Sequence, residues 1–131
     1  MNYTRTLMRA SALVLALFGV VGTFAPDELL QWLNAPVVPL LILLVQVLGA
    51  LYLGFAGLNW MARDQLIGGI YSRPVAVGNL LHFLTAGLAA LKLLASTPYL
   101  PGLWLFTLIY AAFAIGFSIV LFRHPIRTPA V

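Results

Sequence analysis

The chain has 131 residues, of which 63% are hydrophobic and 8% are charged. A water-soluble domain carries roughly 45–50% apolar and about 25% charged residues, so this composition excludes a domain surrounded by water. The formal net charge of +4 does not indicate a nucleic-acid partner, because the basic residues stand singly at the ends of apolar runs. Cysteine is absent from the sequence, which excludes disulfides, thiolate metal sites and dithiol redox chemistry.

Four apolar runs predict an all-α membrane protein, a bundle of four transmembrane helices in a single domain, residues 1–131. About 20 residues are needed to cross a hydrocarbon core of ~30 Å. The first run resembles a signal peptide, but Pro26 would directly follow the cleavage point, so we interpret this run as a retained helix. The predicted spans are residues 7–24, 38–62, 75–95 and 102–122.

The connectors between the spans are short. Asp27–Leu33 is predicted to form a short interfacial helix that Trp32 anchors at the membrane surface. The connector 63–74 combines charged residues with Gly68, Gly69 and Tyr71.

The basic residues predict the orientation, because the side of a membrane protein that is rich in Lys and Arg is cytoplasmic. Six of the seven basic residues fall on one side of the predicted bundle, and Lys92 lies near the other. Both termini are therefore expected in the cytoplasm. The six residues are Arg5, Arg9, Arg63, Arg73, Arg123 and Arg127.

Small residues predict where the helices pack, since association in lipid depends on close backbone contact and interhelical hydrogen bonds. The second span carries the stripe Ala50, Gly54 and Gly57 with Gly49 beside it, and the same stripe would serve a homo-oligomer. A leucine at Gly54 is expected to force close-packed helices apart. The first span offers Gly19 and Gly22, and the fourth offers Ala111, Ala112, Ala114 and Gly116.

The third span separates into two faces at helical spacing. One face is expected to meet lipid through Leu81, Leu84, Leu88 and Leu91, and the other is expected to meet protein through Asn79, His82, Ala86 and Ala89. Gln46 and Lys92 are interpreted as structural, with Lys92 reaching outward to the membrane surface.

Polar residues inside the spans are costly in hydrocarbon, so a function is expected among them. Tyr52 and Asn59 share one face of the second span, and Asn79, His82 and Thr85 follow at intervals of three on the third. At 1.5 Å per residue, both asparagines lie about 4–6 Å from the cytoplasmic ends, and Tyr52 and Thr85 lie near the middle at ~15 Å. The two spans are antiparallel and joined by a short loop, so these residues are expected to form a polar lane.

Two interpretations of this lane stay open. It holds helices together by hydrogen bonds, or it is a site for a lipid, quinone or other amphiphile whose polar group meets His82. In the second case Tyr52, Asn59, Asn79 and His82 border a cavity open toward the cytoplasmic leaflet, with Arg63 and Arg73 at its mouth. The alternatives are a homo-oligomeric small transporter or channel, a subunit of a larger membrane complex, or a membrane enzyme that uses His82 with Tyr52 or Tyr110.

No cofactor and no metal are expected. A zinc site needs three or four ligands, and no carboxylate accompanies His82. Bis-histidine haem needs two histidines at membrane depth, whereas His124 follows the fourth span. The three acidic residues lie in connectors, which argues against a drug–proton antiporter.

The stretches GALYLGFAGLNWMARD and GGIYSRPVAVGNLLHF resemble small four-helix proteins of the bacterial inner membrane, the DoxX-like proteins and neighbouring families of unknown function. The resemblance covers mainly the second and third spans. It implies a four-helix fold and a bacterial cytoplasmic membrane, and it carries no activity to this chain.

Overall fold

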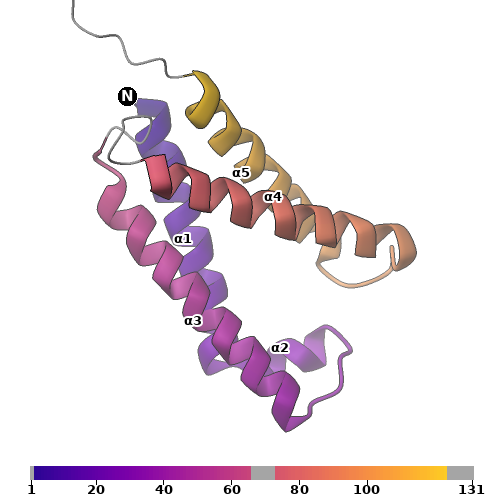
Figure 1. Cartoon of the computed structure of the whole chain (residues 1–131). Helices are drawn as coiled ribbons and strands as arrows, with labels where there is room; N and C mark the ends of the chain where they lie inside the picture. The colour runs from indigo at the N-terminus through magenta and orange to yellow at the C-terminus, as the bar shows by residue number, and fades with distance from the viewer. Residues whose placement is uncertain (1, 66–72, 124–131) are drawn as a thin grey trace, which may run out of the picture.

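The computed structural model describes residues 2–65 and 73–123, and in these ranges it contains helices and no strand (Figure 1). Four of the helices are long and apolar enough to cross a membrane, which confirms the predicted spans as helices. Pro26 and Pro39 stand at the first positions of α2 and α3, where no backbone donor is lost. The helices are α1 (Asn2–Phe24), α2 (Pro26–Trp32), α3 (Pro39–Ala62), α4 (Arg73–Ser96) and α5 (Leu103–Arg123).

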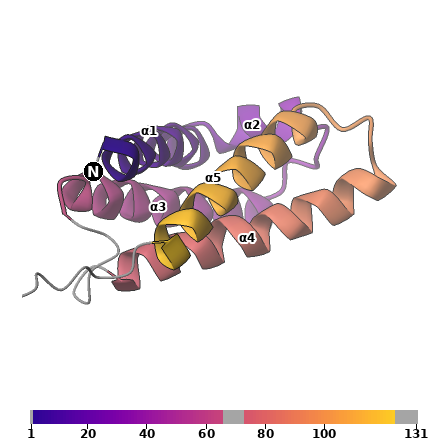
Figure 2. The same cartoon turned by 90° about the horizontal axis from the view of Figure 1, so that it is seen from above.

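The long helices are arranged as two antiparallel pairs, α1 with α3 and α4 with α5 (Figures 1 and 2). The pairs meet at the end that holds the start of α1 and the end of α3, and they diverge toward the other end. The predicted contact between α3 and α4 therefore exists only over a short stretch of each helix.

Glycines bring the backbones of α1 and α3 together. A Cβ at Gly49 would lie 2.6 Å from Thr23 Oγ1, and one at Gly19 would lie 2.9 Å from the Gly49 carbonyl oxygen. No larger residue fits at these positions without moving a helix. The prediction for Gly54 is wrong, because a Cβ at Gly54 or Gly57 would meet no other atom within 4 Å.

The faces of α4 follow the prediction with one exception. Asn79 is buried, His82 and Ala86 are partly buried, and the four leucines assigned to the outside are 42–57% exposed. Ala89 is exposed, because α4 has diverged from α3 at this level.

The helix α1 begins at Asn2, earlier than the apolar run that predicts it. Its first turns are held by the structure beside them, since Thr4 is 6% exposed and Arg5 pairs with Asp64 after α3. Hydropathy could not place this boundary, because the residues that extend the helix are polar.

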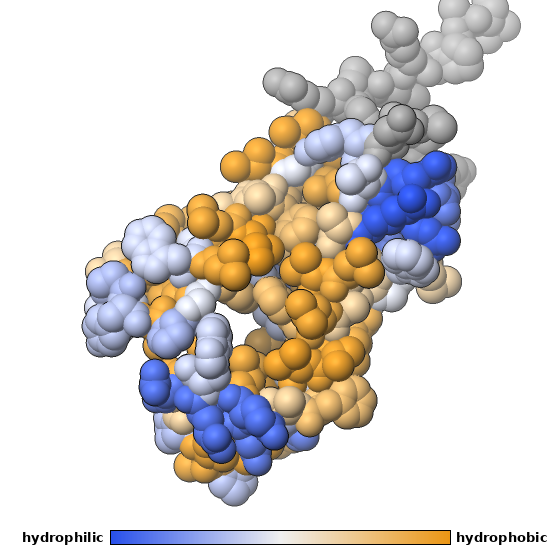
Figure 3. Space-filling view, turned by 180° about the vertical axis from the view of Figure 1, so that it is seen from behind, coloured by the Kyte–Doolittle hydropathy of each residue, from blue (hydrophilic) through white to orange (hydrophobic). Residues whose placement is uncertain are grey.

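At the diverging end, α2 bridges the two helix pairs. The Trp32 ring lies against Gly102, and a Cβ at Gly102 would overlap this ring. Gly102 has φ +71°, which glycine adopts without the cost that other residues meet. Figure 3 shows an opening through the molecular surface between the pairs, on the side of the crossing where α2 lies.

Candidate functional site

Two asparagines form the first polar contact between the pairs. The Asn59 and Asn79 side chains exchange two hydrogen bonds, each 2.7 Å long. Asn59 Nδ2 also donates to Ser11 Oγ at 2.9 Å, and Asn79 Nδ2 donates to the Val75 carbonyl at 2.9 Å. Both amides have thus used their N–H donors on protein acceptors, and these residues hold helices together.

A second polar contact joins three ring side chains deeper along the helices. The Tyr110 hydroxyl donates to the Tyr52 hydroxyl at 2.9 Å, and it lies 3.2 Å from His82 Nε2. Tyr110 is thus the middle member of a chain of hydrogen bonds from α3 through α5 to α4. We call Tyr52, Tyr110 and His82 the hydroxyl–imidazole chain.

Aromatic rings surround this chain on every helix of the two pairs. The Phe55 ring stacks on His82 with centroids 5.3 Å apart, and the Phe83 ring meets it edge-on at 5.1 Å. Phe106 stacks on Tyr110 at 4.1 Å, and Phe18 lies 6.0 Å from Tyr52. The polar atoms are therefore set among apolar rings contributed by all four long helices.

The hydroxyl–imidazole chain leaves one donor and one acceptor unused. Two hydroxyls and a neutral imidazole carry three protons, whereas the chain contains two hydrogen bonds. If Tyr110 donates to Tyr52, the Tyr52 proton and His82 Nδ1 have no partner among the described residues. If the chain runs the other way, a proton on Nδ1 and the Tyr52 oxygen are left.

The hydroxyl–imidazole chain is not fully enclosed by protein. Tyr52 is 8% exposed and Tyr110 is fully buried, but His82, Phe18 and Phe106 are only partly buried. Beyond His82 on α4, Thr85 and Ala89 are exposed. The opening seen in Figure 3 lies on this diverging side of the crossing, and the side toward the meeting ends is filled by the asparagine pair.

Other predicted site residues lie apart from the chain. Thr85 donates to the Leu81 carbonyl of its own helix and does not join the polar lane. Arg63 contacts Asp64 and Trp60, and Arg73 is exposed at the start of α4. At 1.5 Å per residue, these two arginines lie about 14–16 Å along the helices from His82 and Tyr52. Five residues named in the sequence analysis lie outside the described ranges: Gly68, Gly69, Tyr71, His124 and Arg127.

Tyr110 is the central residue that the polar lane did not include. A usable signal was present, since Tyr110 lies seven residues into α5, about 10 Å from its start, and so can reach the level of Tyr52. The small residues predicted on α5 divide into two groups: Ala114 and Gly116 are buried, with Gly116 against Leu7 of α1, whereas Ala111 and Ala112 are exposed.

The described residues contain no group of three His, Asp or Glu side chains able to hold a metal ion. Comparison of the chain with family models, curated proteins and solved structures finds no match.

Proposed function

We propose that this protein is a non-enzymatic component of a bacterial cytoplasmic membrane, inserted with both termini in the cytoplasm. In this proposal it binds a lipid, a quinone or another amphiphile between its two helix pairs. The polar group of the ligand bonds to the hydroxyl–imidazole chain, and the apolar part lies in the opening beside it. The resemblance to DoxX-like proteins stays a prediction.

The unused donor and acceptor of the hydroxyl–imidazole chain are the observation that carries this proposal. A hydrogen-bonding group without a partner is costly in hydrocarbon, where no water can replace the bond. The His82 side chain is only partly buried, so one end of the hydroxyl–imidazole chain is not sealed by protein. A carbonyl or hydroxyl of a ligand satisfies either direction of the chain.

The depth of the hydroxyl–imidazole chain in the membrane restricts which polar group a ligand can place there. Tyr52 is ten residues before the end of α3, and His82 is nine residues after the start of α4, so both lie about 14–15 Å from the inner ends. This is near the middle of a ~30 Å core, where a permanent charge is expensive. An uncharged polar group on an apolar tail fits this position.

The test compares stability and ligand in the same preparations. The full-length protein is purified in a mild detergent, and its lipids are extracted and identified by mass spectrometry beside thermal unfolding curves. His82→Phe keeps a ring among the aromatic neighbours and removes both ring nitrogens, whereas His82→Gln keeps a polar group. We expect His82→Phe to unfold close to the parent and to lose a small molecule that is enriched in the parent.

The control is Thr85→Val, which removes a hydroxyl that bonds only within α4. This variant should keep the enriched molecule. A parent that carries no enriched molecule contradicts the proposal, as does a series in which ligand and stability are always lost together.

The homo-oligomer through Gly49, Ala50, Gly54 and Gly57 stays a prediction, with a smaller surface. Gly49 is already packed against α1, so Ala50, Gly54 and Gly57 alone are exposed for a second copy. The alternative of an enzyme that uses His82 with Tyr52 or Tyr110 names the residues that the hydroxyl–imidazole chain joins. The alternatives of a transporter or a complex subunit gain no support from the geometry.

A further inference from the structure

A groove runs along the outside of the α1–α3 pair, away from the hydroxyl–imidazole chain. Its volume is about 380 Å³, and its walls are almost wholly apolar. Ala12 and Ala16 of α1 face Gly57 of α3 across it, and these small side chains leave the space between the helices. The groove is open along its outer side.

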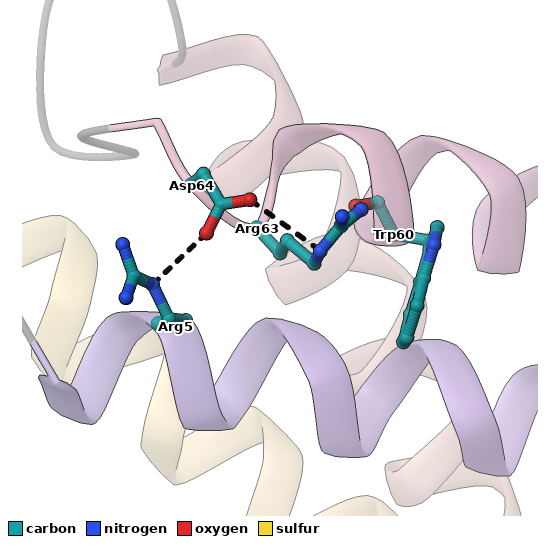
Figure 4. Close-up of polar contacts among 4 residues, drawn as sticks. All are labelled: Arg5, Trp60, Arg63 and Asp64. Atoms are coloured by element: carbon teal, nitrogen blue, oxygen red, sulfur yellow. Dashed lines mark hydrogen bonds and ion pairs between the residues drawn. The ribbon is translucent and has the colours of Figure 1, made fainter.

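Cationic side chains stand at the inner end of this groove. Arg5 and Arg9 precede Ala12 and Ala16 at intervals of four, three and four, so all four share one face of α1. Arg5 Nε lies 2.9 Å from a carboxylate oxygen of Asp64. Figure 4 shows this ion pair. Arg9 is exposed and has no ion-pair partner among the described residues.

Trp60 contacts both an arginine and the groove. Its ring forms part of the groove wall, and the Arg63 guanidinium lies 4.5 Å above the ring centroid. Arg63 Nε is also 3.5 Å from Asp64, so Arg5 and Arg63 share a single carboxylate (Figure 4). Three arginines against one carboxylate leave two positive charges on the helical turns next to the residues that line the apolar groove.

We propose that this groove binds an anionic phospholipid of the inner leaflet. One acyl chain lies between Ala12, Ala16 and Gly57, and the phosphate is bound by Arg9 and Arg5 beside Trp60. The charge of the site and its apolar floor complement the two parts of such a lipid. The cytoplasmic leaflet is also the leaflet that carries anionic lipids. The proposal rests on membrane insertion in the proposed orientation, and it is independent of the site at His82.

Asp64 sets the strength of the site in this arrangement. Its carboxylate occupies Arg5 and Arg63, and both pairs are partly exposed, with side-chain exposures of 44%, 28% and 51% for Arg5, Arg63 and Asp64. Exposed ion pairs are weak, so a phosphate competes for the same guanidinium groups. Removal of the Asp64 charge is therefore expected to strengthen lipid binding.

The test is native mass spectrometry of the full-length protein in a mild detergent, titrated with phosphatidylglycerol or with phosphatidylcholine of identical acyl chains. The parent should prefer phosphatidylglycerol. Arg9→Gln should weaken binding of phosphatidylglycerol about fivefold, the size of one basic residue near an anionic surface. Asp64→Asn should strengthen it. Lys92→Gln, which removes a cation at the other end of α4, should change nothing.

A variant that fills the groove distinguishes binding of a lipid from binding of free phosphate. Gly57→Leu projects into open space and should leave the fold intact, since a Cβ there meets no atom within 4 Å. It should weaken binding of both lipids, and inorganic phosphate should not displace the lipid. The proposal is overturned if Arg9→Gln and Lys92→Gln act alike, if phosphatidylcholine binds equally well, or if Gly57→Leu has no effect. Loss of this site with retention of the ligand at His82 would leave the proposed function intact.

Discussion

Asn59 on α3 and Asn79 on α4 each donate one hydrogen bond to the other and one to a further acceptor. They are 0% and 1% exposed, and they belong to different helix pairs. The asparagine pair thus links α3 to α4 where these helices approach each other, and both N–H groups of each amide donate to protein acceptors.

This pairing predicts strong coupling between the two positions. Asn59→Leu or Asn79→Leu alone leaves the other amide buried without its partner, at a cost of about 1–3 kcal/mol in the free energy of unfolding. The double variant removes both amides, so it should be no less stable than the worse single variant. Thermal unfolding in detergent measures the cycle, and additive losses would contradict the paired geometry.

The glycine contacts predict opposite results at two positions of α3. Gly49→Leu forces a side chain into Thr23 and should destabilise the protein by about 1–3 kcal/mol, as overpacking does. Gly54→Leu projects into open space and should unfold like the parent. Thermal unfolding curves of the two variants measure this difference. A large loss of stability in Gly54→Leu would mean that another helix or a second copy of the protein packs on that face.

The central position of Tyr110 predicts unequal losses of stability along the hydroxyl–imidazole chain. Tyr110→Phe removes both hydrogen bonds, whereas Tyr52→Phe removes one. At about 0.6 kcal/mol for each interhelical bond in a membrane, the expected losses are roughly 1.2 and 0.6 kcal/mol. Equal unfolding temperatures for the two variants would show that the hydroxyl of Tyr110 does not link its neighbours.

The contact between Trp32 and Gly102 predicts a sensitive position in a loop. Gly102→Ala places a Cβ in the Trp32 ring and holds alanine at a positive φ, which together should cost at least about 1–2 kcal/mol. Adding Trp32→Ala removes the overlap but not the backbone cost, so the double variant should recover part of the loss. No recovery in thermal unfolding would mean that Trp32 does not rest on Gly102.

The absence of cysteine allows a direct test of orientation. Tyr99→Cys places a thiol at a position that is 82% exposed between α4 and α5, and Asp64→Cys places one at the opposite end. A maleimide that cannot cross the membrane should label Tyr99→Cys in intact cells and Asp64→Cys only after lysis. The reverse pattern would invert the proposed topology.

Hydropathy located all four long helices, because their apolar runs have the length that a membrane requires. Depth along each helix identified the asparagine pair, since polar groups at matching levels have few other partners. The short helix Pro26–Trp32 also agrees with the prediction for Asp27–Leu33. These features depend on residues that are close in sequence, or on the depth of a residue along its own helix.

The sequence does not show which helices pack against each other. Gly49 and Gly54 carry the same local signal, yet Gly49 touches α1 and Gly54 touches no other helix. Small residues indicate that close packing is permitted, but not which helix will use the surface. Tyr110 was named only as an alternative partner of His82 and was left out of the polar lane for the same reason, because its role depends on how the pairs cross.

Close backbone packing joins two helices of one pair, and side-chain hydrogen bonds join the two pairs. Glycine packing joins α1 to α3, whereas the bonds Asn59–Asn79 and Tyr110–Tyr52 both run from one pair to the other. In the proposed function, a ligand that bonds to Tyr52 therefore acts on one of the hydrogen bonds between the pairs, which also share one hydrophobic core through rings such as Phe18 and Phe106. Under the proposed function, occupancy of the site and the angle between the pairs are thermodynamically linked: a ligand that binds more tightly at one angle favours that angle by the same factor.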